Sequence, residues 1–108
     1  MGPREFEFRR WEKWLEVRAQ TLRQTGQAAE LRCGGPPTPK PCCSFRVQTD
    51  CALGQFDVWV TGEADFDVVD AQTKVFAHNV WGLLLDDVSF EDAFEDFLRR
   101  VIQHSKSG

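Results

Sequence analysis

Five carboxylates lie in one short stretch of the chain, FDVWVTGEADFDVVD (Phe56 to Asp70), which contains no lysine or arginine. Two kinds of chemistry use carboxylates at this density. A hydrolase uses a pair of them as general acid and general base, with one pKa raised in an apolar pocket. A binding surface uses them as an array of negative charge that attracts a cationic partner. The five acidic residues are Asp57, Glu63, Asp65, Asp67 and Asp70.

A tryptophan stands among these carboxylates. Trp59 follows Asp57 by two residues, so in a strand both side chains point to the same face. Two interpretations are open: a solvated strand face with a tryptophan under a loop, or a protein-binding face, where tryptophan is the residue type most enriched at hot spots. Residues 47–98 hold twelve acidic side chains and one basic side chain, Lys74. Because surfaces usually mix the two signs, this segregation favours a binding face.

The charge of the chain also limits its partners. The formal net charge is −4, and the acidic half of the chain repels nucleic-acid phosphates and anionic lipid. We therefore expect neither nucleic acid nor a membrane as a partner. The beginning of the chain, MGPREFEFRRWEKWLE, is charged throughout and lacks the apolar run of a signal peptide, which predicts a cytoplasmic protein.

Catalysis has little support in the sequence. No nucleophile, zinc, phosphate-loop or dinucleotide motif occurs, so we expect neither an enzyme nor a cofactor. Asp57 could form the carboxylate pair of a hydrolase with Asp65 or Asp67. However, nothing in the sequence suggests the apolar pocket that would raise the pKa of one of them. His78 alternates with apolar residues and is interpreted as structural, and His104 lies in the tail.

Four cysteines are present, Cys33, Cys42, Cys43 and Cys51. The adjacent pair Cys42–Cys43 is no zinc knuckle, and no histidine lies at ligand spacing nearby. In a reducing compartment such cysteines are expected to be free thiols, and we predict no metal site.

The elements that would position the acidic residues follow from the apolar periodicity. Steps of three and four predict an N-terminal helix over 6–25 and a C-terminal helix over 89–103. Alternation with period two predicts a four-stranded antiparallel meander over 44–82, preceded by a Pro/Gly/Cys linker over 33–43. The fold class is α+β in a single domain, residues 1–108. Both helices should cover one sheet face, formed by Phe45, Val47, Phe56, Val58, Val60, Phe66 and Val68.

The order of these motifs resembles the TriTu immunity proteins. The resemblance rests on the strand that ends in Trp59 and reaches Gly62 after two residues, followed by Glu63 and a strand closing in Val69–Asp70. A WxxWL-like run, Trp11 to Leu15, lies in the N-terminal helix, and His78 and the segment FEDAFEDFLRRV follow the strands. Together these motifs span most of residues 6–102, and the linker with its cysteines lies outside them.

The resemblance implies a cytosolic antidote to an antibacterial polymorphic toxin of the type VI or Rhs kind. The toxin domain would be an ADP-ribosyltransferase that modifies elongation factor Tu, and the immunity protein would bind it as a monomer, one to one, blocking access of NAD or of the target. The candidate toxin-binding residues are Asp57, Trp59, Glu63, Asp65, Asp67 and Asp70. A competing acidic patch comprises Asp86, Asp87, Glu91, Asp92, Glu95 and Asp96.

The alternative function is a non-catalytic adaptor or regulatory protein for another basic protein, of which an inhibitor that mimics DNA is a variant.

Overall fold

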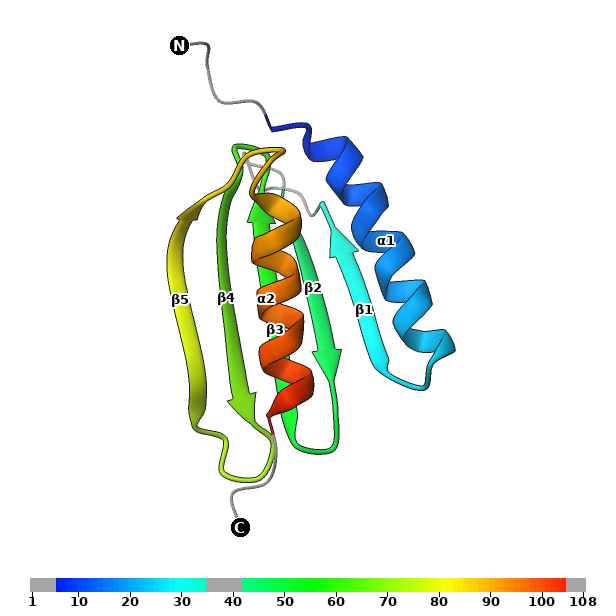
Figure 1. Cartoon of the computed structure of the whole chain (residues 1–108), viewed down its shortest axis with the longest axis vertical. Coiled ribbons are helices and arrows are strands. Elements are labelled where there is room, and N and C mark those ends of the chain that lie inside the picture. Colours follow the sequence, from blue (N-terminus) through cyan, green and yellow to red (C-terminus); the bar gives the residue numbers. More distant parts are fainter. Residues whose placement is uncertain (1–5, 35–41, 105–108) are drawn as a thin grey trace.

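The computed structural model describes residues 6–34 and 42–104 (Figure 1). Its two helices and five strands follow the order α1 (Phe8–Gln24), β1 (Ala28–Cys33), β2 (Cys42–Gln48), β3 (Ala52–Trp59), β4 (Glu63–Asp70), β5 (Phe76–Leu84) and α2 (Phe90–Gln103). All neighbouring strands are antiparallel, in the sheet order β1-β2-β3-β4-β5. The α+β class is confirmed, and the expected four strands are corrected to five.

The strand that the sequence did not reveal is β1, with the sequence AAELRC. Alanine, glutamate, leucine and arginine favour helices, and the alternation of Ala29 and Leu31 with Glu30 and Arg32 is too short to predict a strand against that composition. Its conformation comes from tertiary contacts. Gly26 turns the chain after α1 with φ +89, and β1 then pairs with β2 along its whole length.

Both helices pack on the same face of the sheet, as the sequence predicts. α1 packs on β1 and β2, whereas α2 packs on β2, β3 and β4. Figure 1 shows α2 running over the middle of the sheet and α1 lying beside β1. The apolar stripes expected on the two helices face the core, with Phe8, Trp14 and Ala93 only partly buried. The buried members are Trp11, Leu15, Ala19 and Leu22 on α1, and Phe90, Phe94, Phe97, Leu98 and Val101 on α2. Neither helix has the length and apolar character needed to cross a membrane.

The centre of the core is aromatic. Phe56 of β3 packs against Phe94 and Phe97 of α2 at ring-centroid distances of 5.4 Å. Phe90, at the beginning of α2, contacts Phe56 at 5.8 Å and stacks on Trp11 of α1 at 4.4 Å. These rings join both helices to the middle of the sheet. Buried aromatic side chains of this kind each contribute several kcal/mol to stability.

Two boundary predictions are corrected. Val60 was expected in the buried face, but β3 ends at Trp59, so Val60 lies in the turn to β4 and is 40% exposed. The linker expected over 33–43 is shorter at both ends, because Cys33 closes β1 and Cys42 begins β2. Its central part, 35–41, lies outside the described residues.

A glycine sets how closely α2 approaches β3. A Cβ atom on Gly54 would lie 2.3 Å from Cγ2 of Val101 and 3.0 Å from Cε1 of Phe97, both buried. We expect Gly54→Ala to lower the free energy of unfolding by about 1–3 kcal/mol, because it overpacks this contact. Urea denaturation checks this, with Leu53→Ala on the opposite face of β3 as the control. A Gly54→Ala protein with an unchanged midpoint would contradict the close contact.

Candidate functional site

Three of the predicted site residues gather on the face of the sheet that α1 and α2 leave uncovered, which we call the open face. Alternation puts the buried residues of β3 and β4 under the helices and Asp57, Asp65 and Asp67 on the other side. In the register of the sheet Asp57 lies directly opposite Asp65, and Asp67 lies opposite Gln55. The three carboxylates, the carboxylate cluster, are therefore neighbours on two adjacent strands, and each is half-buried.

Neutral donors orient two members of this cluster. Asp57 accepts hydrogen bonds from the Ser44 hydroxyl at 2.6 Å and from the Gln55 amide at 3.1 Å. Asp65 accepts one from the backbone N–H of Gly82 at 3.0 Å. Hydrogen bonds from neutral groups hold the oxygens in place without cancelling their charge.

The arrangement of the three carboxylates disfavours a negative charge on Asp67. Burial raises the pKa of its carboxyl above the usual range, and the charge of Asp57 raises it further. Like charges on adjacent strands destabilise a sheet. The native state therefore holds the Asp67 carboxyl at a site that disfavours ionisation.

The carboxylate cluster has no ion-pair partner among the basic side chains that the structure describes. Within residues 6–34 and 42–104, no ion pair involves Asp57, Asp65 or Asp67. The arginines that share the open face are engaged elsewhere: Arg32 pairs with Glu30, and Arg46 donates to the Gln55 side chain at 2.9 Å. The open face thus presents uncompensated negative charge over β3 and β4.

The competing acidic patch around α2 differs in this respect. Arg18 of α1 pairs with Glu95 at 2.8 Å, and Asp96 pairs with both Arg99 and Arg100. Burial opposes ionisation of Asp96, but the hydrogen bonds from the two arginines outweigh it and lower the pKa of its carboxyl. The charge of this patch is therefore partly neutralised within the protein.

Asp87 of the same patch joins two elements. Its Oδ1 accepts hydrogen bonds from the backbone N–H of Glu7 at 2.9 Å and from Nε1 of Trp11 at 2.7 Å. These two donors lower the pKa of the Asp87 carboxyl. Asp86 accepts from the backbone N–H groups of Val88 and Ser89, before α2 begins. Both carboxylates serve the connection between β5 and the helices.

Of the other predicted site residues, Trp59 and Glu63 lie near the carboxylate cluster, whereas Asp70 lies apart from it. Trp59 is half-buried at the end of β3, on the same face as Asp57 and opposite Cys42. Glu63 begins β4 and accepts a hydrogen bond from the Thr61 hydroxyl at 3.1 Å. Asp70 instead organises the turn after β4. It accepts from the backbone N–H groups of Gln72 and Thr73, and from Nε2 of His104 at 2.7 Å.

The bonds to Asp70 hold its carboxylate in place. The hydrogen bond with His104, together with those from Thr73, keeps the pKa of Asp70 well below its usual range. The structure thus separates Asp70 from Asp57, Asp65 and Asp67, and ties β4 to the end of α2.

Sequence reasoning did not find the apolar side chains exposed along β5. Trp81 is 74% exposed, Leu84 61% and Phe76 57%. The pairing of β4 with β5 is irregular between Ala64 and Phe66, where Gly82 adopts φ +72. This irregularity comes after Trp81, so Trp81 still alternates with half-buried Val80 and lies on the open face, although it is apolar. The remaining signal was compositional, because Val75 to Leu85 contain no acidic residue, lysine or arginine.

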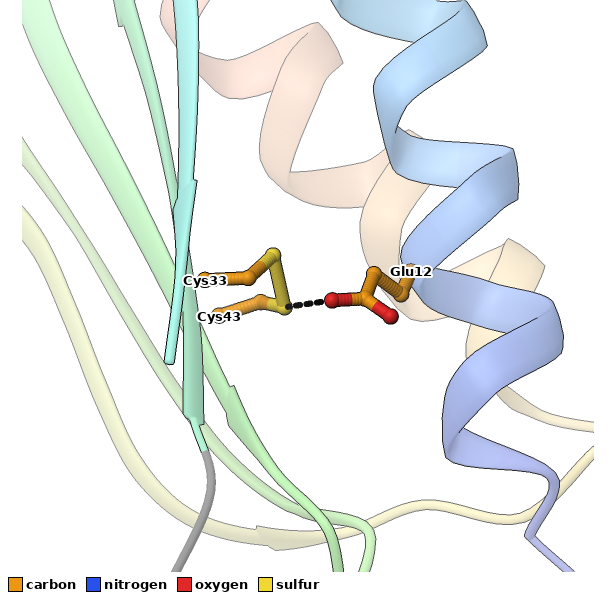
Figure 2. A group of neighbouring side chains, drawn as sticks. All are labelled: Glu12, Cys33 and Cys43. Atoms are coloured by element: carbon orange, nitrogen blue, oxygen red, sulfur yellow. Dashed lines mark hydrogen bonds between the residues drawn. A yellow bond between two sulfur atoms is a disulfide. The ribbon is translucent and has the colours of Figure 1, made fainter. Parts of the chain in front are cut away.

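One side-chain group has the composition of a metal site. The atoms Glu12 Oε2, Cys33 Sγ and Cys43 Sγ lie within 4.8 Å of one another. Cys33 and Cys43 occupy directly paired positions of β1 and β2 and form a disulfide, with Glu12 of α1 pointing toward them (Figure 2). A cysteine binds a metal as a thiolate, which the disulfide removes. In this state the group offers a metal only one carboxylate.

The disulfide corrects the expectation of free thiols at Cys33 and Cys43. The number of residues between two cysteines does not reveal that a hairpin register places them face to face, with Cα atoms 4.0 Å apart. Cys42 and Cys51 are free, as expected.

The histidines lie outside the carboxylate cluster. Nδ1 of His78 is 3.3 Å from Nη1 of Arg100, on the helix side of the sheet, and His104 contacts Asp70. Of the grooves between described residues, one of about 590 Å³ lies beside the turn Thr49–Cys51 and the end of α2. It contains no member of the carboxylate cluster. The open face itself has a groove of about 480 Å³ beside Arg46 and Leu53, and this groove contains none of the three carboxylates either.

The fold and this surface define a small two-layer α+β protein with an uncovered acidic sheet face. The chain belongs to the TriTu immunity protein family: residues 7–100 match the family described as Immunity protein TriTu. The resemblance inferred from the sequence motifs is thereby confirmed. No curated protein and no solved structure matches the chain at a significant level. Membership implies a role in neutralising a toxin by binding it, and proteins of this kind are generally non-catalytic.

The raised pKa of Asp67 predicts a gain in stability on neutralisation. Because its folded-state pKa lies above the unfolded value, the native state binds more protons there, and its contribution to stability falls as pH rises through the folded pKa. We expect Asp67→Asn to raise the free energy of unfolding at pH 7 by about 0.5 kcal/mol. The difference should shrink as pH falls through the folded pKa and become small below the unfolded value of about 3.9, where the carboxyl is mostly protonated in both states.

Denaturation of both proteins at pH 7 and pH 3.5 measures this, with Asp50→Asn in an exposed turn as the control. A loss of stability in Asp67→Asn at pH 7 would contradict the proposal that the charge of Asp67 destabilises the native state.

The disulfide predicts the number of reactive thiols. We expect two thiols per chain to react with a chromogenic reagent in denaturant without reductant, and four after reduction. Reduction should lower the free energy of unfolding by about 2–3 kcal/mol, because it releases the constraint on the unfolded chain. Four reactive thiols before reduction, in protein purified with air exposure, would contradict the pairing.

Proposed function

We propose that this immunity protein neutralises a toxin domain of the ADP-ribosyltransferase type by covering its NAD-binding or target-binding cleft with the open face. The observation that carries the proposal is the contrast in charge compensation. Two carboxylates of α2, Glu95 and Asp96, are paired with arginines, whereas Asp57, Asp65 and Asp67 have no such partner in the described chain. An uncompensated array that lowers stability is explained if a partner supplies the positive charge.

The chemistry of the proposed toxin fits such a surface. An enzyme that binds NAD holds a diphosphate, which favours positive charge in its cleft. The carboxylate cluster would take the position of those phosphates. Opposite charges would also speed association, and salt would weaken this effect. Trp59, on the same face, supplies an aromatic contact at the edge of the cluster.

The same proposal includes the compartment of the protein, its stoichiometry with the toxin, and the delivery and target of that toxin. The antidote acts in the cytoplasm as a monomer in a one-to-one complex and needs no cofactor, since blocking a cleft requires only binding. Its toxin is delivered between cells by a contact-dependent system of the type VI or Rhs kind, and the toxin's target is elongation factor Tu. An adaptor for another basic protein is the alternative, which the same open face supports.

Co-purification with the C-terminal domain encoded by the adjacent upstream gene tests the proposal directly. We expect a stable complex that protects elongation factor Tu from modification and whose association rate falls between 50 mM and 500 mM salt. No complex with a folded toxin domain would overturn the assignment for that pair. A complex that leaves the transferase active would leave the adaptor function in its place.

Variants of the open face locate the charge effect. We expect the triple variant Asp57→Asn, Asp65→Asn, Asp67→Asn to weaken binding at least about tenfold at low salt, mainly through slower association. The triple variant Asp50→Asn, Glu91→Gln, Asp92→Asn removes the same charge at exposed positions outside the open face; it is the matched control and should bind like the native protein. Equal effects of the two sets would argue for net charge rather than for the open face.

Trp59 is tested separately. If Trp59 anchors the complex, Trp59→Ala should cost about 2 kcal/mol or more of binding free energy, measured by calorimetry. A thermal denaturation curve controls for folding. Unchanged affinity in a folded Trp59→Ala protein would remove this residue from the interface.

A further inference from the structure

The two edges of the sheet are built differently. At one edge, β1 carries the ion pair between Glu30 and Arg32 and packs against α1. At the other edge, β5 pairs only with β4 among the strands of the described chain. An edge strand presents backbone N–H and C=O groups that can pair with another chain, and proteins usually protect such edges with charges, prolines or covering elements.

β5 has little of this protection. Its nine residues, FAHNVWGLL, include no proline, and His78 is its only titratable side chain. The chain instead exposes Phe76, Trp81 and Leu84 along this edge, which we call the apolar edge. A long, uncharged edge with exposed aromatics is a surface that a partner covers or that promotes aggregation.

The irregularities of β5 determine which part can pair. The register with β4 is regular from His78 to Val80, opposite Val68 to Phe66, and is interrupted on both sides. At one interruption Gly82 donates its N–H to the Asp65 carboxylate, which fixes the bend next to Trp81. The regular stretch offers backbone groups, and the bend presents Trp81 beside a member of the carboxylate cluster.

The carboxylates next to the apolar edge indicate what kind of segment could bind along β5. Asn79 of β5 lies opposite Asp67, and Leu84 lies opposite Glu63. β4 and β5 contain no lysine or arginine. Trp81 and Leu84 lie on the same face of the sheet as Asp65 and Asp67, so a chain lying along β5 would meet apolar side chains and carboxylates together on the open face. An acidic or uncharged segment would supply no positive charge to Asp65 and Asp67, whereas a basic segment would.

We propose that an extended segment of the toxin, with an apolar residue flanked by lysine or arginine, pairs with β5 as a short sixth strand. Its apolar side chain packs on Trp81 and Leu84, and its basic side chains face Asp65 and Asp67. This inference rests on the proposed function, because it names the part of the toxin that the immunity protein recognises. Main-chain pairing provides affinity in this mode, and the side chains provide specificity.

Binding measurements on the native protein and two variants test the inference. We expect Trp81→Ala to weaken binding of the isolated toxin domain about 30-fold, as for a central aromatic anchor. Val17→Ala is the control, because Val17 is an apolar residue, 59% exposed, on α1. It should bind within twofold of the native protein. The high exposure of Trp81 means that its loss should leave the fold intact, which thermal denaturation checks.

Amide hydrogen exchange supplies the structural readout. In the complex, amides of β5 that exchange in the unbound protein should become protected, whereas amides of β1 at the opposite edge should not change. Tight binding of the toxin by both native protein and Trp81→Ala, with no added protection in β5, would overturn this inference and leave the proposed function standing. Failure of the native protein to bind a folded toxin would overturn both.

The oligomeric state of the isolated protein tests whether a second copy of the chain, rather than the toxin, covers β5. We expect light scattering to give the mass of a monomer at micromolar concentration. A dimer that Trp81→Ala dissociates would show that a second copy of the chain covers β5, and would overturn the inference.

Discussion

The packing of α2 on the middle of the sheet is the interaction on which the rest of the structure depends. Phe90, Phe94 and Phe97 meet Phe56 from one side, and Phe90 continues this contact to Trp11 of α1. Because both helices reach the same aromatic cluster, they must cover the same face of the sheet. The uncovered acidic face is thus a direct consequence of where the aromatic side chains lie.

The open face shows how a binding surface can differ from an ordinary charged surface. Most acidic groups of α2 and its preceding loop are engaged by arginines, backbone N–H groups or Trp11. Asp57 and Asp65 receive neutral donors instead, and Asp67 has a raised pKa. Charge left uncompensated at a cost to stability is what a protein needs if its function is to attract a cationic partner.

The bend at Gly82 connects the acidic centre of the open face to its apolar edge. The hydrogen bond from Gly82 to Asp65 makes one carboxylate part of the geometry that displays Trp81. Charge and apolar area are thereby adjacent on one surface of a small protein. In such an arrangement long-range attraction guides the encounter, and burial of an aromatic ring supplies much of the final affinity.

The sequence alone determined the helices, four of the strands and the side of the sheet that the helices cover, because these follow from apolar periods that are local and strong. It also placed Asp57, Asp65 and Asp67 on one exposed face and indicated the TriTu family. Only the tertiary structure decided the rest. β1 has the composition of a helix and is a strand through its pairing with β2.

Cys33 meets Cys43 because the register brings them together, and Trp81 is exposed because it lies on the face of β5 that neither helix covers. Asp70 bonds to His104 across 34 residues of sequence. Periodicity reports which side of its own element a residue occupies. Which distant group it meets there depends on register, irregularities and the path of the chain, and these are set by packing of the whole molecule.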